Sequence, residues 1–181
     1  MLANGHRKQL LALARNSIQC GFDGCFDAPD AATFDEPLRR PAGAFVTLRT
    51  PDGDLRGCIG SIRAREALVQ AVHANALNAA FRDPRFCPVV RHELGRLSIE
   101  VSVMGPIERV TAVEDVMVGR DGLIISRGRY AGLLLPQVAT EYGWDRQTFL
   151  DQTCVKAGLG RGDWRHPETV IEKFSAEVFG E

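Results

Sequence analysis

Apolar residues recur along the chain with two periods, one typical of helices and the other typical of strands. Near the N-terminus they fall at helical spacing, at Leu10, Leu11, Ala14 and Ile18. This first segment ends near Gly21. A second stretch, 66–81, has a broad apolar face and is rich in alanine, which favours the helix intrinsically. The pattern therefore predicts two packing helices in the first half of the chain.

Between these two helices the chain predicts a β-hairpin. The stretch 42–49 reads as a strand, and the turn signal Asp52–Gly53 follows it. The chain then returns as a second strand. We expect Cys58 at the far end of this returning strand, where the chain leaves the sheet.

The stretch 97–103 alternates between apolar and polar residues over its whole length. This period of two predicts a strand with one buried face. We expect the apolar set to face the core: Leu97, Ile99, Val101 and Val103. We expect the polar set to face a cleft or solvent: Ser98, Glu100 and Ser102.

The second half of the chain predicts another hairpin, over 123–127 and 130–135, and two further helices. Pro136 suits the start of a short helix through Tyr142, and Asp145 caps a helix over 146–157. The last stretch, 170–179, fits a strand or a helix by its pattern. The stretch 20–41 is expected to be a long surface loop, with one turn over 31–34. Hairpins interrupted by helices, without βαβ alternation, indicate an α+β fold with a mostly antiparallel sheet and packed helices.

Length and charge narrow the class of protein. With 181 residues, the chain fits one domain, or one domain with a smaller second lobe. The net charge of −1, with mixed signs, leaves no general basic patch, so we expect no nucleic-acid partner. No apolar run is long enough for a signal peptide or a membrane span, and we expect no membrane association.

The cysteines and histidines argue against a metal site. The five cysteines are irregularly spaced and contain no Cys-x-x-Cys pair, which indicates a reducing cytoplasm without a disulfide framework or structural zinc. The four histidines lack close ligand spacing, and His92–Glu93 stands alone in a predicted loop. No glycine-rich stretch matches a phosphate-binding fingerprint. We expect no metal and no cofactor.

Two glycines, Gly57 and Gly60, bracket Cys58 in the returning strand of the first hairpin. Glycine permits positive φ and also lets another group approach the backbone closely. We therefore predict that one of these glycines has positive φ, or has a close backbone or ligand contact that excludes a Cβ atom.

The six residues Leu55–Gly60, LRGCIG, resemble the signature of the AMMECR domain family. Further stretches resemble the family in the same order: 79–86, 97–103, 132–138 and 156–159. The chain is most similar to the bacterial and archaeal version called AmmeMemoRadiSam system protein A. The resemblance implies the AMMECR-domain fold for a single domain over 5–181, with the last stretch as a strand.

The same resemblance implies partners. By this resemblance, the bacterial and archaeal version is a partner of a Memo-like protein and a radical SAM protein. The resemblance names no reaction and no substrate. From the resemblance we expect the Memo-like protein and the radical SAM protein as partners. A small-molecule ligand is a further candidate.

Cys58 is the first candidate for chemistry. Backbone N–H groups and Arg56 can stabilise a thiolate at this position. His73 can serve as its base if the helix 66–81 folds back over the end of the strand. In the alternative interpretation, Cys58 is a small buried hydrophobe between glycines, and His73 is a core histidine with one satisfied nitrogen.

The second candidate is a ligand-binding set of charged motif residues and signature glycines: Arg56, Gly57, Gly60, Asp83, Arg85 and Glu100. Arginine supplies a bidentate fork for a carboxylate, so this set suits a zwitterionic or carboxylated ligand. An ordinary structural ion-pair network is the alternative, and the sequence leaves both open.

Two hypotheses of different class follow. The first is a thiol-dependent enzyme, or enzyme subunit, that acts on a small molecule or a modified peptide through Cys58. The second is a noncatalytic module that binds a ligand or docks onto the Memo-like and radical SAM proteins. The second is favoured because no set of nucleophile, base and orienting group can be completed from the sequence.

Overall fold

The structure, a computed structural model, describes residues 1–181 and divides into two compact units. The first unit comprises Met1–Met104 together with Glu177–Glu181, and the second comprises Gly105–Ala176. Each unit has its own cluster of buried apolar residues. We describe the two units separately.

The first unit contains a three-stranded antiparallel arrangement and two long helices. Its strands are β1 (Ala44–Arg49), β2 (Leu55–Ser61) and β3 (Ser98–Met104). β1 pairs with β2 on one side and with β3 on the other, so β2 is the edge strand. The helices are α1 (Asn4–Gly21) and α3 (Leu68–Phe81). Both predicted helices and the predicted hairpin are therefore confirmed.

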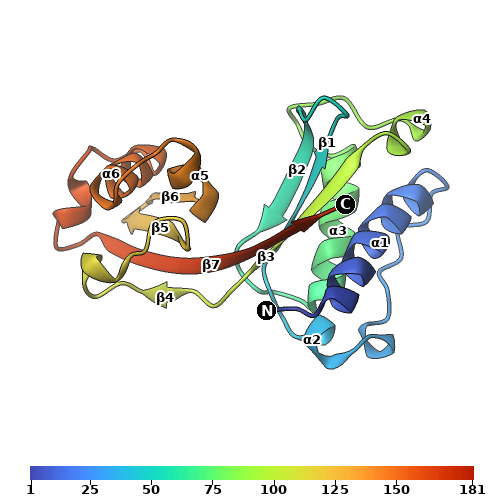
Figure 1. The fold of residues 1–181 in the computed structure, drawn as a ribbon, viewed down its shortest axis with the longest axis horizontal. Helices are drawn as coiled ribbons and strands as arrows, with labels where there is room; N and C mark the ends of the chain where they lie inside the picture. Colours follow the sequence, from blue (N-terminus) through green and yellow to red (C-terminus); the bar gives the residue numbers. More distant parts are fainter. The chain divides into compact units, whose positions relative to one another are not determined.

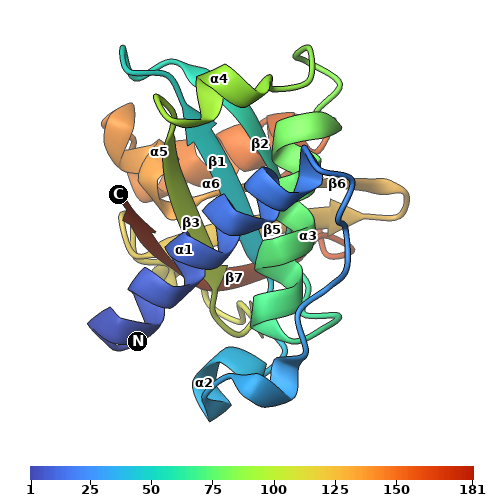
Figure 2. The same cartoon turned by 90° about the vertical axis from the view of Figure 1, so that its right-hand side faces the viewer.

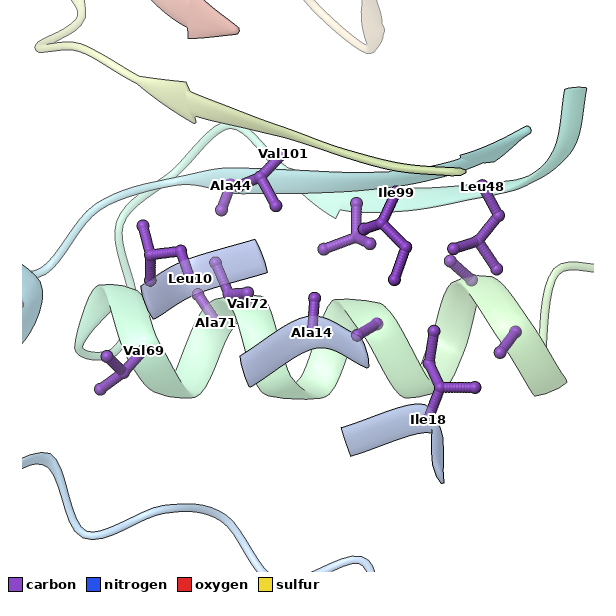
Figure 3. Packing of buried hydrophobic residues seen from close by; sticks show 14 of the residues in the cluster. Leu10, Ala14, Ile18, Ala44, Leu48, Val69, Ala71, Val72, Ile99 and Val101 are labelled. Atoms are coloured by element: carbon purple, nitrogen blue, oxygen red, sulfur yellow. The ribbon is translucent and has the colours of Figure 1, made fainter. Parts of the chain in front are cut away.

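Helices α1 and α3 cover the same face of these strands (Figures 1 and 2). The apolar face of each helix meets the inward side chains of the strands, as Figure 3 shows for Ala14, Val72 and Ile99. The fully buried members of this core include Leu10, Ile18, Val46, Leu48 and Val101. Periodic apolar positions thus fix which face of each element is buried.

The alternation along β3 has the predicted faces, with one correction. Leu97, Ile99 and Val101 are buried in the core, and Val103 packs against it while partly buried. Ser98 is exposed and Glu100 is half-buried. Ser102 is only 2% exposed, so the prediction that it faces a cleft or solvent is wrong. Its direct cross-strand neighbour is Phe45, which is large enough to shield a serine side chain.

Short helical turns replace parts of two predicted loops. The stretch 20–41 contains η1 (Ala31–Thr33), where a single turn was expected over 31–34, and α2 (Glu36–Arg39), which the sequence pattern did not indicate. The side chain of Asp30 caps η1 by accepting a hydrogen bond from the Ala32 N–H. The pair His92–Glu93 lies in the short helix α4 (Arg91–Leu94) and not in a loop.

The second unit contains β4 (Glu108–Arg109), β5 (Asp121–Arg127), β6 (Tyr130–Leu134) and most of β7 (Val170–Gly180). β5 pairs antiparallel with β6 and with β7, which confirms the second predicted hairpin. Short turns η2 (Val113–Asp115) and η3 (Asp163–Arg165) lie between the strands and helices. The last element is a strand, as the family resemblance implied.

Two helices pack on the strands of the second unit. These are α5 (Pro136–Glu141) and α6 (Arg146–Lys156) (Figure 1). Asp145 caps α6 as predicted, since its Oδ1 accepts a hydrogen bond from the Thr148 N–H at 2.7 Å. Phe149 and Leu150 of α6 are buried against the β5 side chains Leu123 and Ile125.

The architecture confirms the predicted α+β class. All strand pairs described above are antiparallel, and the long helices pack on the strands without βαβ alternation. None of the helices has an apolar stretch of the length that a bilayer crossing requires.

Candidate functional site

Cys58 lies in the middle of β2, where it is directly opposite Thr47 of β1. The expectation that it ends the strand is wrong, because β2 continues its pairing with β1 as far as Ser61. The Cys58 side chain is half-buried. The Thr47 hydroxyl donates a hydrogen bond to Sγ of Cys58, with 3.1 Å between the two atoms.

The two signature glycines are required by close packing and not by positive φ. Neither has a φ in the left-handed region. A Cβ atom on Gly57 would overlap the carbonyl oxygen of Ala79 in α3, and one on Gly60 would overlap the ring of Phe45. The predicted close contact that excludes Cβ is therefore confirmed, and the positive φ is not.

The glycine contacts also show which way the Cys58 side chain points. Gly57 faces α3, and successive residues of a strand point to opposite faces. Cys58 therefore points to the face of the strands that α3 does not cover. Thr47 of β1 points to this same face as its direct cross-strand neighbour.

Asp83 and Arg85 bind the backbone of Cys58 at the outer edge of β2. Oδ2 of Asp83 accepts a hydrogen bond from the Cys58 N–H at 2.9 Å, and Nη2 of Arg85 donates to the Cys58 carbonyl at 3.1 Å. The two side chains also form a bidentate pair, with N–O distances of 2.9 and 2.7 Å. This pair, the edge clamp, satisfies backbone groups that an edge strand otherwise leaves open.

The edge clamp carries a persistent charge pair. Hydrogen bonds from Arg85 outweigh the effect of burial and hold the pKa of Asp83 far below its usual range. The same hydrogen bonds raise the pKa of Arg85 above its ordinary value. Asp83 is buried, whereas about half of the Arg85 side chain is exposed. The buried Asp83 carboxylate therefore stays ionised.

Arg56 has a separate set of partners. Its Nε and Nη2 atoms each lie 3.0 Å from a carboxylate oxygen of Glu93, and its Nη1 donates to the carbonyl of Cys87 at 2.9 Å. Hydrogen bonds from Arg56 also lower the pKa of Glu93. Arg56 is thus engaged by Glu93 and not by the thiol.

Glu93 is the residue that the sequence analysis missed. Besides pairing with Arg56, its Oε2 accepts a hydrogen bond from the Val90 N–H at 2.8 Å. A glutamate at the third position of a helix commonly reaches back to the N-cap backbone. Because the N-cap residue Val90 has no side-chain acceptor, the sequence carries only half of the capping-box pattern at α4, and nothing local indicated the contact with Arg56.

His73 lies on α3 and has partners on α1 and in the loop after it. Its Nδ1 is 2.8 Å from Oγ of Ser17, and its Nε2 is 3.3 Å from the carbonyl oxygen of Phe26. Only 7% of the residue is exposed. The structure does not bring His73 and Cys58 together, because the Cys58 side chain points away from the face that α3 covers.

Glu100 completes a row of polar side chains across the three strands. It lies on β3 directly opposite Thr47, which in turn lies opposite Cys58. We call Cys58, Thr47 and Glu100 the polar row. The Glu100 carboxylate is half-buried and has neither a hydrogen bond nor an ion pair within the chain, whereas Thr47 donates to the Cys58 sulfur.

The structure therefore does not bring the predicted ligand-binding set together in one place. Asp83 and Arg85 form the edge clamp, Arg56 pairs with Glu93, and Gly57 is covered by α3. Glu100 belongs to the polar row, and Gly60 packs under Phe45. No three histidine, cysteine, aspartate or glutamate side chains are grouped closely enough to hold a metal ion.

Comparison with known proteins shows the family of this chain. The AMMECR1 family model matches residues 11–179. The chain belongs to the AMMECR1 family. This finding confirms the family that the Leu55–Gly60 signature indicated.

Archaeal relatives cover almost the whole chain. Protein NEQ441 of Nanoarchaeum equitans is 39% identical over 179 residues, which span 95% of this chain and 98% of that protein. Protein PF1979 of Pyrococcus furiosus is 46% identical over 181 residues, which span 95% of this chain and 86% of that protein. The crystal structure of protein PH0010 from Pyrococcus horikoshii matches this chain with a TM-score of 0.84 and 41% sequence identity. The match covers 95% of this chain and 89% of the PH0010 chain.

In this member of the AMMECR1 family, most of the stretch Leu55–Gly60 has a structural role. Gly57 allows α3 to pack closely on β2, and Gly60 makes room for the ring of Phe45. Arg56 connects β2 to α4 through its ion pair with Glu93. The backbone of Cys58 is held by the edge clamp. The Cys58 side chain and its neighbours in the polar row are the polar groups that these packing roles do not explain.

Proposed function

We propose that this AMMECR1-family protein is a binding module that receives a cationic group on its polar row. The observation that carries the proposal is the unpaired Glu100 carboxylate, which lies in register with the Thr47 hydroxyl and the Cys58 thiol. A half-buried carboxylate gains most from a partner with N–H donors and a positive charge. An ammonium or guanidinium group meets that requirement.

The rigidity of the surroundings supports binding. The edge clamp fixes the Cys58 backbone, and β1 lies between β2 and β3 with hydrogen-bonded neighbours on both sides. A site held by strands changes little between its free and bound states, so less of the binding free energy is lost in ordering it.

Partners follow from the family resemblance. We propose that the cationic group belongs to a Memo-like protein or a radical SAM protein, or to a small molecule that these proteins handle.

The five unpaired cysteines support the accompanying proposal of a reducing, cytoplasmic environment.

A thiol-dependent enzyme, or enzyme subunit, is the second candidate, and one contact favours it. The Thr47 hydroxyl donates a hydrogen bond to Sγ of Cys58, which holds the sulfur in a defined position on the polar row. The enzyme requires a base for the thiol proton, and His73 has its own partners on α1 and the following loop. The binding module is therefore the better-supported proposal.

Calorimetric titration of the full chain tests the binding proposal. The probes are a purified Memo-like protein and, separately, a purified radical SAM protein from the same source. We expect binding to at least one of them, and we expect Glu100→Gln to raise the dissociation constant at least about tenfold. Glu66→Gln, at an exposed residue outside the polar row, serves as the matched control and should leave the affinity unchanged.

Two results would overturn the proposal in distinguishable ways. Equal affinities for the wild type and Glu100→Gln would show that the polar row is not the contact. Absence of binding to both proteins would show that the partner class is wrong.

A further inference from the structure

The C-terminal end of α1 brings two cysteines together. The Cys25 N–H donates to the Cys20 carbonyl at 3.1 Å, and the Gly24 N–H donates to the Gly21 carbonyl at 3.2 Å. Gly24 has a φ of +76°. This combination of two hydrogen bonds and a left-handed glycine is the Schellman motif, which commonly ends helices.

The Schellman motif determines how close the two side chains lie. In this motif the residue that donates the outer hydrogen bond frequently contacts the residue whose carbonyl accepts it, and here these residues are Cys25 and Cys20. Given the 3.1 Å hydrogen bond, standard bond lengths limit the separation of their Cα atoms to at most about 7 Å. Disulfides span Cα separations of about 4.4–6.8 Å.

Both thiols are also accessible. Cys20 and Cys25 are exposed, and they line the same small hollow of about 200 Å³ together with Ser17 and His73. Gly24 has no other group within 4 Å of its Cβ position, so the turn between the two cysteines is open on that side. Proximity and accessibility thus occur in the same two residues.

We propose that Cys20 and Cys25 form a reversible redox pair, oxidised by a disulfide of the glutathione class. The thiolate of one cysteine attacks oxidised glutathione, which forms a mixed disulfide and releases one reduced glutathione. The second thiolate then attacks the protein sulfur of that mixed disulfide and releases the second reduced glutathione. Two electrons and two protons pass from the protein to glutathione, and the Cys20–Cys25 disulfide is formed.

Oxidation acts on the wall of a neighbouring cavity. Phe26 follows Cys25 directly, and its carbonyl oxygen lies 3.3 Å from Nε2 of His73. Phe26 and His73 also line a cavity of about 440 Å³, together with Leu77, Phe81 and Arg82. In Figure 2 the segment after α1 runs alongside α3, which carries the other wall of this cavity. A disulfide at Cys25 restricts the backbone next to Phe26 and so fixes this wall.

Mass spectrometry of the full chain tests the proposal. The protein is equilibrated with mixtures of reduced and oxidised glutathione, quenched by iodoacetamide and cleaved with trypsin. Residues 16–39 form one tryptic peptide with both cysteines. We expect this peptide to become two hydrogen atoms lighter than its reduced form and to resist alkylation, whereas Cys87 stays free of any intrachain disulfide.

Matched variants and a second readout complete the test. Cys25→Ser should leave Cys20 as a mixed disulfide with glutathione, and Cys87→Ser should leave the redox pair unchanged. Amide hydrogen exchange at Phe26 should slow at least about tenfold on oxidation. Mixed disulfides alone in the wild type, or two thiols that stay alkylatable, would overturn the redox pair, and unchanged exchange at Phe26 would overturn its effect on the cavity wall.

Discussion

At the residue scale, the sulfur of Cys58 and its backbone have separate roles. The backbone is held at the strand edge by Asp83 and Arg85, whereas the sulfur points away from α3 and accepts a hydrogen bond from Thr47. The backbone contacts stabilise the edge of the sheet, whereas the hydrogen bond from Thr47 leaves the thiol available for binding. The two roles can be tested separately because they depend on different atoms.

Native alkylation with iodoacetamide separates the binding module from the thiol enzyme. We expect Cys58 to react more slowly than the exposed Cys20, Cys25 and Cys87, because it is half-buried and has no base beside it. Cys154 should react last, since it is buried and burial raises the pKa of its thiol. The measurement is peptide mass spectrometry over a time course. A Cys58 that reacts first under native conditions would instead support the enzyme.

Asp83 should make the stability of the protein depend on acid pH. Because the folded-state pKa of Asp83 is lowered, the carboxylate stabilises the fold above the ordinary aspartate pKa of about 3.9. That contribution is lost as pH falls below this value towards the folded pKa. We expect Asp83→Asn to be less stable than the wild type at pH 7, and the difference to shrink between about pH 5 and pH 2.

Urea unfolding of both proteins at several pH values measures this dependence. Asn retains an acceptor for the Cys58 N–H, so the comparison reports on the charge pair with Arg85. Asp52→Asn, at an exposed residue of the hairpin turn, is the control and should follow the wild type. A gap between the wild type and Asp83→Asn that stays constant with pH would contradict the prediction.

At the element scale, the contact of α3 with β2 depends on Gly57. We expect Gly57→Ala to lower the free energy of unfolding by at least about 2 kcal/mol, because its Cβ would overlap the Ala79 carbonyl in the helix backbone. Gly95→Ala is the matched control, since Gly95 has a φ of −67° and no group within 4 Å of its Cβ position. It should be neutral or slightly stabilising. Equal stability of both variants in urea unfolding would refute the close contact.

The sequence predicted the long elements well because their apolar period is continuous. The pattern of α1, α3 and β3 needs only the chain itself to indicate which face is buried. The short helices α2 and α4 were missed, since a four-residue helix has too few turns to show a period. Such helices are held by tertiary contacts, such as the pair of Arg56 and Glu93.

The candidate site was predicted in part, for a related reason. Strand register explains why Cys58 and Glu100 belong to one row, but the central Thr47 carried no signal in its own sequence neighbourhood. The sequence also could not show that Asp83 would bind the backbone of Cys58, because a hydrogen bond to the main chain leaves no residue pattern. The chemical type of His73 suggested a base for Cys58. The structure separates the two residues, because α3 packs on the face of the strands opposite to the Cys58 side chain and His73 pairs with Ser17.

At the scale of the whole molecule, strand β7 supplies residues to both units. Its residues from Val170 to Ser175 pair with β5 in the second unit. Its final residues belong to the first unit, where the Glu177 carboxylate accepts hydrogen bonds from the Leu2 N–H and the Arg7 side chain. Unfolding of either unit therefore releases one end of a continuous strand. We propose that the chain, over 5–181, is a single cooperative domain.

Chemical unfolding followed by two probes tests this cooperativity. Both tryptophans, Trp144 and Trp164, lie in the second unit, so their fluorescence reports on that unit alone. The long helices α1 and α3 lie in the first unit and contribute much of the helical circular dichroism. We expect the two signals to have the same midpoint and slope in urea, because β7 links the two cores. Separate midpoints would show instead that the two units unfold independently and that the domain is divided at Met104.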